Sequence, residues 1–131
     1  MDTSAWCAVF DRRDQNHRKA SEFFISLKGR PIQLITSDYI FDETVTLLRA
    51  RIGHSAAVTF GESLLKSSVL IEDVDEPIRT RAWELFVKYR DQDFSFTDCT
   101  SFALMMSLKL EDVFTFDRHF LTMGFVCHPS S

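Results

Sequence analysis

The chain has 131 residues, of which 45% are hydrophobic and 26% are charged, and its formal net charge is −4. This balance is typical of a globular protein, so we treat residues 1–131 as a single domain and exclude a disordered chain. The net acidity argues against a simple polycation for nucleic acid, but an acidic site can still reach phosphate through a divalent cation. No apolar run approaches the roughly 20 residues that span a bilayer. We therefore expect a cytoplasmic protein without membrane contact.

The cysteines do not indicate a disulfide framework or a zinc site. Cys7, Cys99 and Cys127 are an odd number in unrelated contexts and form no C-x-x-C motif. Cys127 and His128 are the only close Cys/His pair, and zinc sites need more ligands than two. We interpret all three cysteines as reduced thiols.

Apolar periodicity and stop signals divide the chain into alternating helices and short strands. Helices are expected over residues 2–10, 14–27, 38–52, 55–66, 76–89 and 97–110. Strands are expected over residues 32–36, 69–71 and 113–116, with a last short one at 125–126. This alternation indicates an α/β domain whose short, mostly parallel central sheet is flanked by helices. In such sheets, functional sites form at the carboxyl ends of the strands.

Two acids lie on helix faces that we expect to point toward the core. Asp98 starts the apolar helix over 97–110, on one stripe with Phe102 and Met105. Glu43 shares a face with Ile40 and Leu47, whereas its neighbour Asp42 falls on another face and is interpreted as a surface acid. Structural explanations stay open, because Asp98 fits a capping box with Ser95 and Glu43 could reach water at the margin of its stripe.

Two further acids lie where an α/β site would be built. Asp117 directly follows the strand over 113–116, and Asp2 precedes the first helix. Each could equally be a plain helix cap. Taken together, Asp2, Glu43, Asp98 and Asp117 form an acidic set at strand ends and helix starts. Carboxylates brought together repel unless they recruit a cation, and hard oxygen ligands suit Mg²⁺ or Mn²⁺.

The four acids and their sequence context resemble the PIN-domain family, and most of all its small VapC-like toxin ribonucleases of bacterial toxin–antitoxin pairs. The resemblance is carried by DTSA at Asp2, ETVTLLR at Glu43, SFTDCTSFA at Asp98 and TFDRHF at Asp117, in that order. It runs from Asp2 to about residue 125 and implies a PIN-like three-layer fold. Family members usually begin with a short apolar strand, whereas only Met1 precedes Asp2 here, so we expect a truncated first strand.

The resemblance also implies a function. Asp2, Glu43, Asp98 and Asp117 match the family's acidic quartet, which binds Mg²⁺ or Mn²⁺ and hydrolyses RNA phosphodiester bonds with a metal-activated water. Thr3 and Ser4, or Thr97 and Ser101, would orient carboxylates or waters around it. The implied partners are an RNA substrate, a cognate antitoxin and a second copy of the chain in a homodimer.

Two other interpretations compete with the toxin ribonuclease. The short first strand favours a PIN-fold binding module that has lost catalysis and acts through RNA or antitoxin contacts. A phospho-accepting α/β domain is disfavoured, because a phosphatase of that kind would carry a second Asp two residues after the first, where Ser4 stands.

Overall fold

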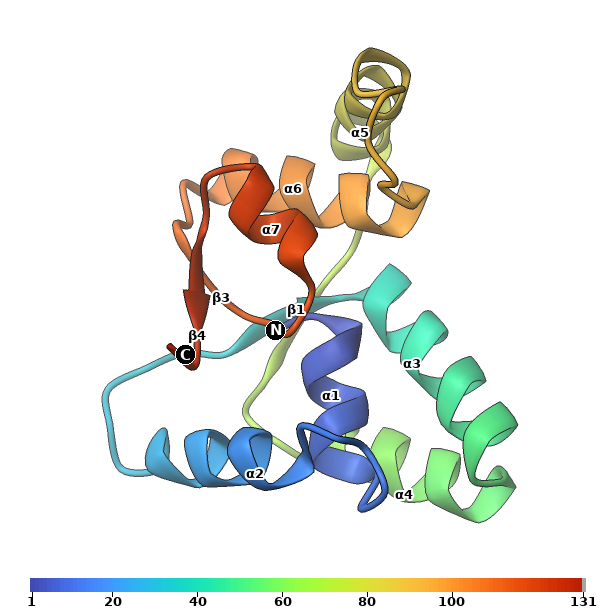
Figure 1. The fold of residues 1–131 in the computed structure, drawn as a ribbon, viewed down its shortest axis with the longest axis vertical. Coiled ribbons are helices and arrows are strands. Elements are labelled where there is room, and N and C mark those ends of the chain that lie inside the picture. Colours follow the sequence, from blue (N-terminus) through green and yellow to red (C-terminus); the bar gives the residue numbers. More distant parts are fainter. Residues whose placement is uncertain (131) are drawn as a thin grey trace.

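The computed structural model describes residues 1–130, and these form the predicted alternation of helices and short strands (Figure 1). The helices are α1 (Thr3–Phe10), α2 (His17–Ser26), α3 (Asp38–Arg51), α4 (His54–Leu65), α5 (Glu76–Lys88), α6 (Phe96–Leu108) and α7 (Arg118–Thr122). The strands are β1 (Ile35–Ser37), β2 (Leu70–Glu72), β3 (Asp112–Phe114) and β4 (Val126–His128). No helix in the described range has the length and apolarity needed to cross a membrane.

Several element boundaries differ from those expected, and side-chain hydrogen bonds explain two of them. Helix α2 begins at His17 and not at Asp14, because the Asp14 carboxylate accepts the backbone N–H of Asn16 at 2.8 Å and closes a turn. Strand β3 ends at Phe114 and not at Phe116, whose N–H donates to Ser4 Oγ at 2.9 Å. Strands β1, β2 and β4 each begin one to three residues later than expected.

The central sheet is present as two parallel pairs and not as one continuous sheet. Strand β1 pairs with β2, and β3 pairs with β4. Met1 and Asp2 lie between the pairs: the Met1 nitrogen donates to the Ile35 carbonyl at 2.7 Å, and the Asp2 N–H donates to the Phe114 carbonyl at 3.0 Å. Two residues therefore connect the halves of the sheet, and they place Asp2 where the carboxyl ends of β1 and β3 meet.

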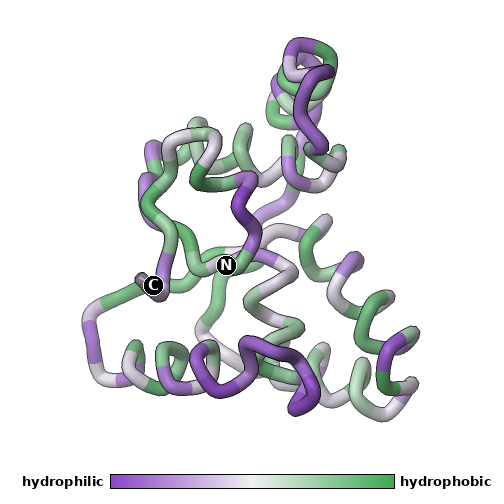
Figure 2. Tube along the Cα trace, in the orientation of Figure 1, coloured by the Kyte–Doolittle hydropathy of each residue, from purple (hydrophilic) through white to green (hydrophobic). Residues whose placement is uncertain are grey.

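The helices cover the strands from two sides, as a three-layer domain requires. In Figure 1, α1 to α4 lie below the strands and α5 to α7 lie above them. The lower core centres on Trp6 and Phe60, and the upper core centres on Phe102 and Phe120. Figure 2 shows that the loop joining α1 to α2 is strongly hydrophilic. The core helices thus fix the frame, while this polar loop lies beside the site described below.

The lower core gives a direct test of the fold. Phe60 is 0% exposed and packs edge-on against the rings of Trp6 and Phe10. We expect Phe60→Ala to lower the free energy of unfolding by about 3–5 kcal/mol, because it removes a large side chain from a packed core. Leu65→Ala in the same helix is the control, because Leu65 is 67% exposed. It should change the free energy of unfolding by less than about 1 kcal/mol. Equal losses in urea unfolding would contradict this packing.

Candidate metal centre

Asp2 is buried, and hydrogen bonds hold its carboxylate in place. It caps α1, accepting the Ser4 N–H, and its Oδ2 also accepts hydrogen bonds from Ser4 Oγ at 2.9 Å and Thr115 Oγ1 at 3.0 Å. Burial raises the pKa of Asp2 to about 6; the hydrogen bond from Ser4 opposes this rise, and the nearby charge of Asp98 adds to it. The carboxylate is therefore fixed in place but unfavourably charged, which is a state that a bound cation would relieve.

Asp98 is positioned by the capping box that the sequence predicts. Its backbone N–H donates to Ser95 Oγ, and its Oδ2 accepts the backbone N–H of Ser95, both at 3.0 Å. Behind it, α6 is buried from Asp98 to Met105, so packing restrains the first turn of this helix. The cap and the buried stripe together hold the carboxylate at the edge of the upper core.

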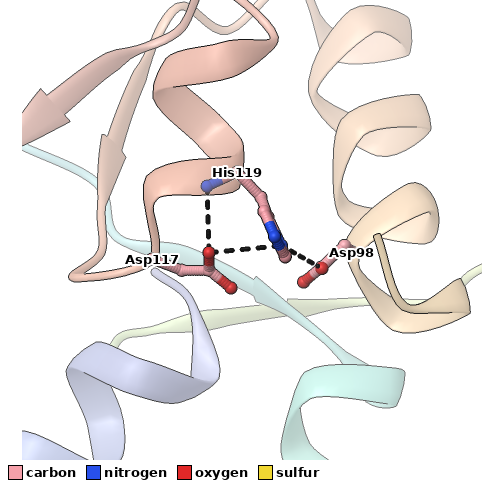
Figure 3. Close-up of side chains that lie close together, drawn as sticks. All are labelled: Asp98, Asp117 and His119. Carbon is pink, nitrogen blue, oxygen red and sulfur yellow. Dashed lines mark hydrogen bonds and ion pairs between the residues drawn. The ribbon is translucent and has the colours of Figure 1, made fainter. Parts of the chain in front are cut away.

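Asp117 and His119 complete a close group with Asp98 (Figure 3). Asp117 follows β3, caps the short helix α7 and accepts the His119 N–H at 2.9 Å. The His119 ring lies between the two acids, with Nδ1 2.9 Å from Asp98 Oδ2 and 3.3 Å from Asp117 Oδ1. One ligand atom from each of these three residues lies within 4.8 Å of the others, which is close enough for a shared metal ion.

A cavity of about 340 Å³ brings all four predicted acids together. Glu43 reaches it from the half-buried face of α3, while Asp42 is exposed, as the helical phase predicts. The carboxylates of Asp2 and Glu43 line the cavity but stand outside the tighter group of Asp98, Asp117 and His119. Whether all four bind one metal centre stays a prediction.

The chemistry of the cavity suits a hard divalent cation. Asp14 adds a fifth carboxylate to its lining, and Arg51 is the one basic side chain among the described lining residues. Thr3 also lines the cavity. Its Oγ1 is buried and has no hydrogen-bond partner within residues 1–130. Carboxylate and hydroxyl oxygens are hard ligands, which Mg²⁺ and Mn²⁺ bind well and which zinc does not favour.

Sequence reasoning missed His119 and weighed the flanking hydroxyl groups only in part. His119 lies within TFDRHF but was not among the predicted ligands, and no spacing rule connects it to Asp98, which lies 21 residues earlier. Of the hydroxyl groups proposed to orient the site, Ser4 does contact Asp2, whereas Ser101 lines a different cavity. A histidine two residues after a candidate ligand was the one available signal.

Comparison with known proteins places the chain in a family. The model of the PIN domain matches residues 1–126, so the chain belongs to the PIN-domain family. It is 36% identical over 126 residues to the 23S rRNA-specific endonuclease VapC20 of Mycobacterium tuberculosis, covering 96% of this chain and 94% of that one. It is also 28% identical over 123 residues to a VapC ribonuclease of Archaeoglobus fulgidus, covering 92% of this chain and 77% of that one.

A solved structure agrees with these sequence matches. The crystal structure of M. tuberculosis VapC20, described as a toxin that cleaves the sarcin–ricin loop, superposes with a TM-score of 0.89 at 35% identity. The match covers 95% of this chain and 94% of that one. The expected PIN-like α/β fold and the resemblance to VapC-like toxin ribonucleases are therefore confirmed.

The raised pKa of Asp2 predicts a pH-dependent effect of Asp2→Asn. The folded state holds the proton more tightly than the unfolded chain, so ionisation of Asp2 destabilises the protein above about pH 6, and this penalty fades as the pH falls from 6 to 4. In chelator, we expect Asp2→Asn to raise the free energy of unfolding at pH 8 by up to about 3 kcal/mol. At pH 4 most of this difference should be gone.

Unfolding of both proteins by urea across this pH range measures the difference. Asp42→Asn, at an exposed acid, is the matched control and should give a flat profile. A gain for Asp2→Asn that is constant with pH, or that grows toward pH 4, would contradict the burial of a charged Asp2.

Proposed function

We propose that this chain is a Mg²⁺- or Mn²⁺-dependent endoribonuclease whose metal ligands are drawn from Asp2, Glu43, Asp98 and Asp117. The observation that carries the proposal is the convergence of these four acids, from four separate parts of the chain, on one cavity. Helix capping explains the positions of Asp2, Asp98 and Asp117 one at a time, since two are caps and Asp98 completes a capping box, but it does not explain why Glu43 lines the same cavity. The chain's nuclease class agrees with the names of its relatives.

The side chains around the acidic cavity have separate tasks in this proposed reaction. When bound, the ion would activate a water molecule for attack on the phosphodiester and stabilise the leaving oxygen. Ser4 and Thr115 hold the Asp2 carboxylate in position, and Ser95 holds that of Asp98. Arg51 lines the same cavity and supplies a positive charge for a phosphate oxygen.

The placement of Asp2 favours the enzyme over the binding module. The expected short first strand is the feature that favours a binding module, because it bears on how firmly Asp2 is held. In the structure, however, its backbone is bonded to Phe114 and its carboxylate to two hydroxyl groups. Asp2 is therefore positioned as firmly as Asp98.

The substrate is expected to be a folded RNA with an accessible loop. VapC20 is named as specific for 23S rRNA and as a toxin that cleaves the sarcin–ricin loop. At 36% identity over nearly the whole chain, an RNA oligonucleotide with that loop is the substrate to test first. We also propose that a cognate antitoxin silences the toxin by covering the acidic cavity.

Loss of one acid should abolish cleavage without unfolding the protein. We expect Asp98→Asn to reduce the cleavage rate with Mg²⁺ or Mn²⁺ by at least about 100-fold, because the carboxylate that holds the ion becomes a neutral amide. Asp42→Asn should cleave at the rate of the unchanged protein, and chelator should stop both. Cleavage that continues in chelator, or that survives Asp98→Asn, would contradict the proposal.

We further propose that the chain forms a homodimer through α5. Trp83 and Val87 are 59% and 57% exposed, and the Trp83 ring stacks on that of Phe86 to give an apolar surface on this outlying helix (Figure 1). Trp83→Glu should convert a dimer into a monomer in size-exclusion chromatography with light scattering. Leu121→Glu, at a residue 65% exposed on α7, should leave the dimer intact. A monomeric unchanged protein would overturn this surface as an interface.

A further inference from the structure

Three aspartates that line the acidic cavity each use one carboxylate oxygen for hydrogen bonds and leave the other without a protein donor. Asp2 and Asp98 accept hydrogen bonds at Oδ2, and Asp117 accepts them at Oδ1. No group within residues 1–130 donates to the second oxygen of any of the three. The bonded oxygen fixes the direction of each carboxylate, so the second oxygen is the one available to an ion.

His119 contacts the bonded oxygens of two of these acids (Figure 3). Its backbone N–H donates to Asp117 Oδ1 at 2.9 Å. Its ring Nδ1 lies 2.9 Å from Asp98 Oδ2 and 3.3 Å from Asp117 Oδ1. Asp98 lies in the first turn of α6 and Asp117 caps α7, so one histidine connects carboxylates that belong to different helices.

The ring nitrogen is the donor in these contacts. An ionised carboxylate only accepts hydrogen bonds, so the lone pair of an unprotonated Nδ1 would be repelled at 2.9 Å. With the proton on Nδ1, the ring gives Asp98 Oδ2 a second hydrogen bond beside the one from the Ser95 N–H. Two donors on one oxygen restrain the carboxylate more strongly than one donor, and they leave Oδ1 of Asp98 for another ligand.

The upper core holds the imidazole in this orientation. The His119 ring meets the Phe94 ring edge to face, with 5.1 Å between centroids, and Phe94 meets the fully buried Phe102 in the same way. Phe102 belongs to α6, so packing connects the His119 ring to the helix that carries Asp98. The His119 side chain is itself 29% exposed, so apolar burial alone does not explain a histidine at this position.

We propose that His119 is a positioning residue of the metal centre, which orients Asp98 and Asp117 by hydrogen bonding and does not bind the ion itself. This role rests on the proposed function, since it requires that an ion bind in the acidic cavity. Groups that hold metal ligands in place affect the site nearly as strongly as the ligands do. Loss of such a group typically costs about 10- to 100-fold in metal affinity.

Two substitutions of His119 separate this role from a merely structural one. His119→Asn places an amide nitrogen near the position of Nδ1 and keeps a donor there, whereas His119→Leu has no donor. In isothermal titration calorimetry, we expect His119→Leu to weaken Mn²⁺ binding by at least about 10-fold and His119→Asn by less than about 3-fold. His54→Leu, at an exposed histidine that begins α4, is the control and should bind Mn²⁺ as the unchanged protein does.

Electron spin-echo spectra of the bound Mn²⁺ test whether His119 is a ligand. A directly bound imidazole would give a nitrogen coupling to the Mn²⁺ signal, and we expect the unchanged protein to show none. This measurement needs no variant, so it tests the proposal even where His119→Leu does not fold.

Three results would overturn the positioning role. His119→Leu could bind Mn²⁺ as tightly as the unchanged protein, or both substitutions could weaken binding equally. Alternatively, a nitrogen coupling in the unchanged protein would make His119 a ligand. Each of these results leaves the ribonuclease proposal intact, because the ion still binds. A failure of the unchanged protein to bind Mn²⁺ would overturn both proposals.

Discussion

The structure depends on the way Met1 and Asp2 connect two parallel strand pairs. Their backbone bonds to Ile35 and Phe114, at 2.7 and 3.0 Å, are the sheet-type contacts between the halves in the described residues. They bring the carboxyl ends of β1 and β3 together, and the acidic cavity forms there. The same connection buries the Asp2 carboxylate beside other acids, so the feature that builds the site also makes it electrostatically unfavourable without a cation.

Three of the four acids serve the fold as well as the site. Asp2 and Asp117 each cap a helix, and Asp98 completes the capping box that Ser95 begins. In each case the hydrogen bond to the backbone fixes a carboxylate that lines the shared cavity. A capping residue is bound to its own backbone, so its side chain has little freedom left to lose when it binds a ligand. Glu43 caps nothing. Its orientation follows from the helical phase of α3 alone, and for that reason it is the strongest sign that the cavity has a function.

Much of this arrangement could be predicted from the sequence, because the signals were local. The capping box at Ser95, the phase that separates Glu43 from Asp42 and the alternation of helices and strands all act over a few residues. The His119 contact to Asp98 and the division of the sheet could not be predicted, since both depend on how distant segments pack. The start of α2 was misplaced because an Asp14 turn competes with the helix there.

The position of a bound ion would test directly whether the acidic cavity is a metal site. Crystals soaked in Mn²⁺ and measured by anomalous diffraction would show where the metal lies relative to the four carboxylates. The structure predicts a peak within coordination distance, about 2.0–2.3 Å, of oxygen atoms of Asp98 and Asp117, with Asp2 and Glu43 bound directly or through water. A peak elsewhere on the molecule, or none in the acidic cavity at saturating Mn²⁺, would contradict it.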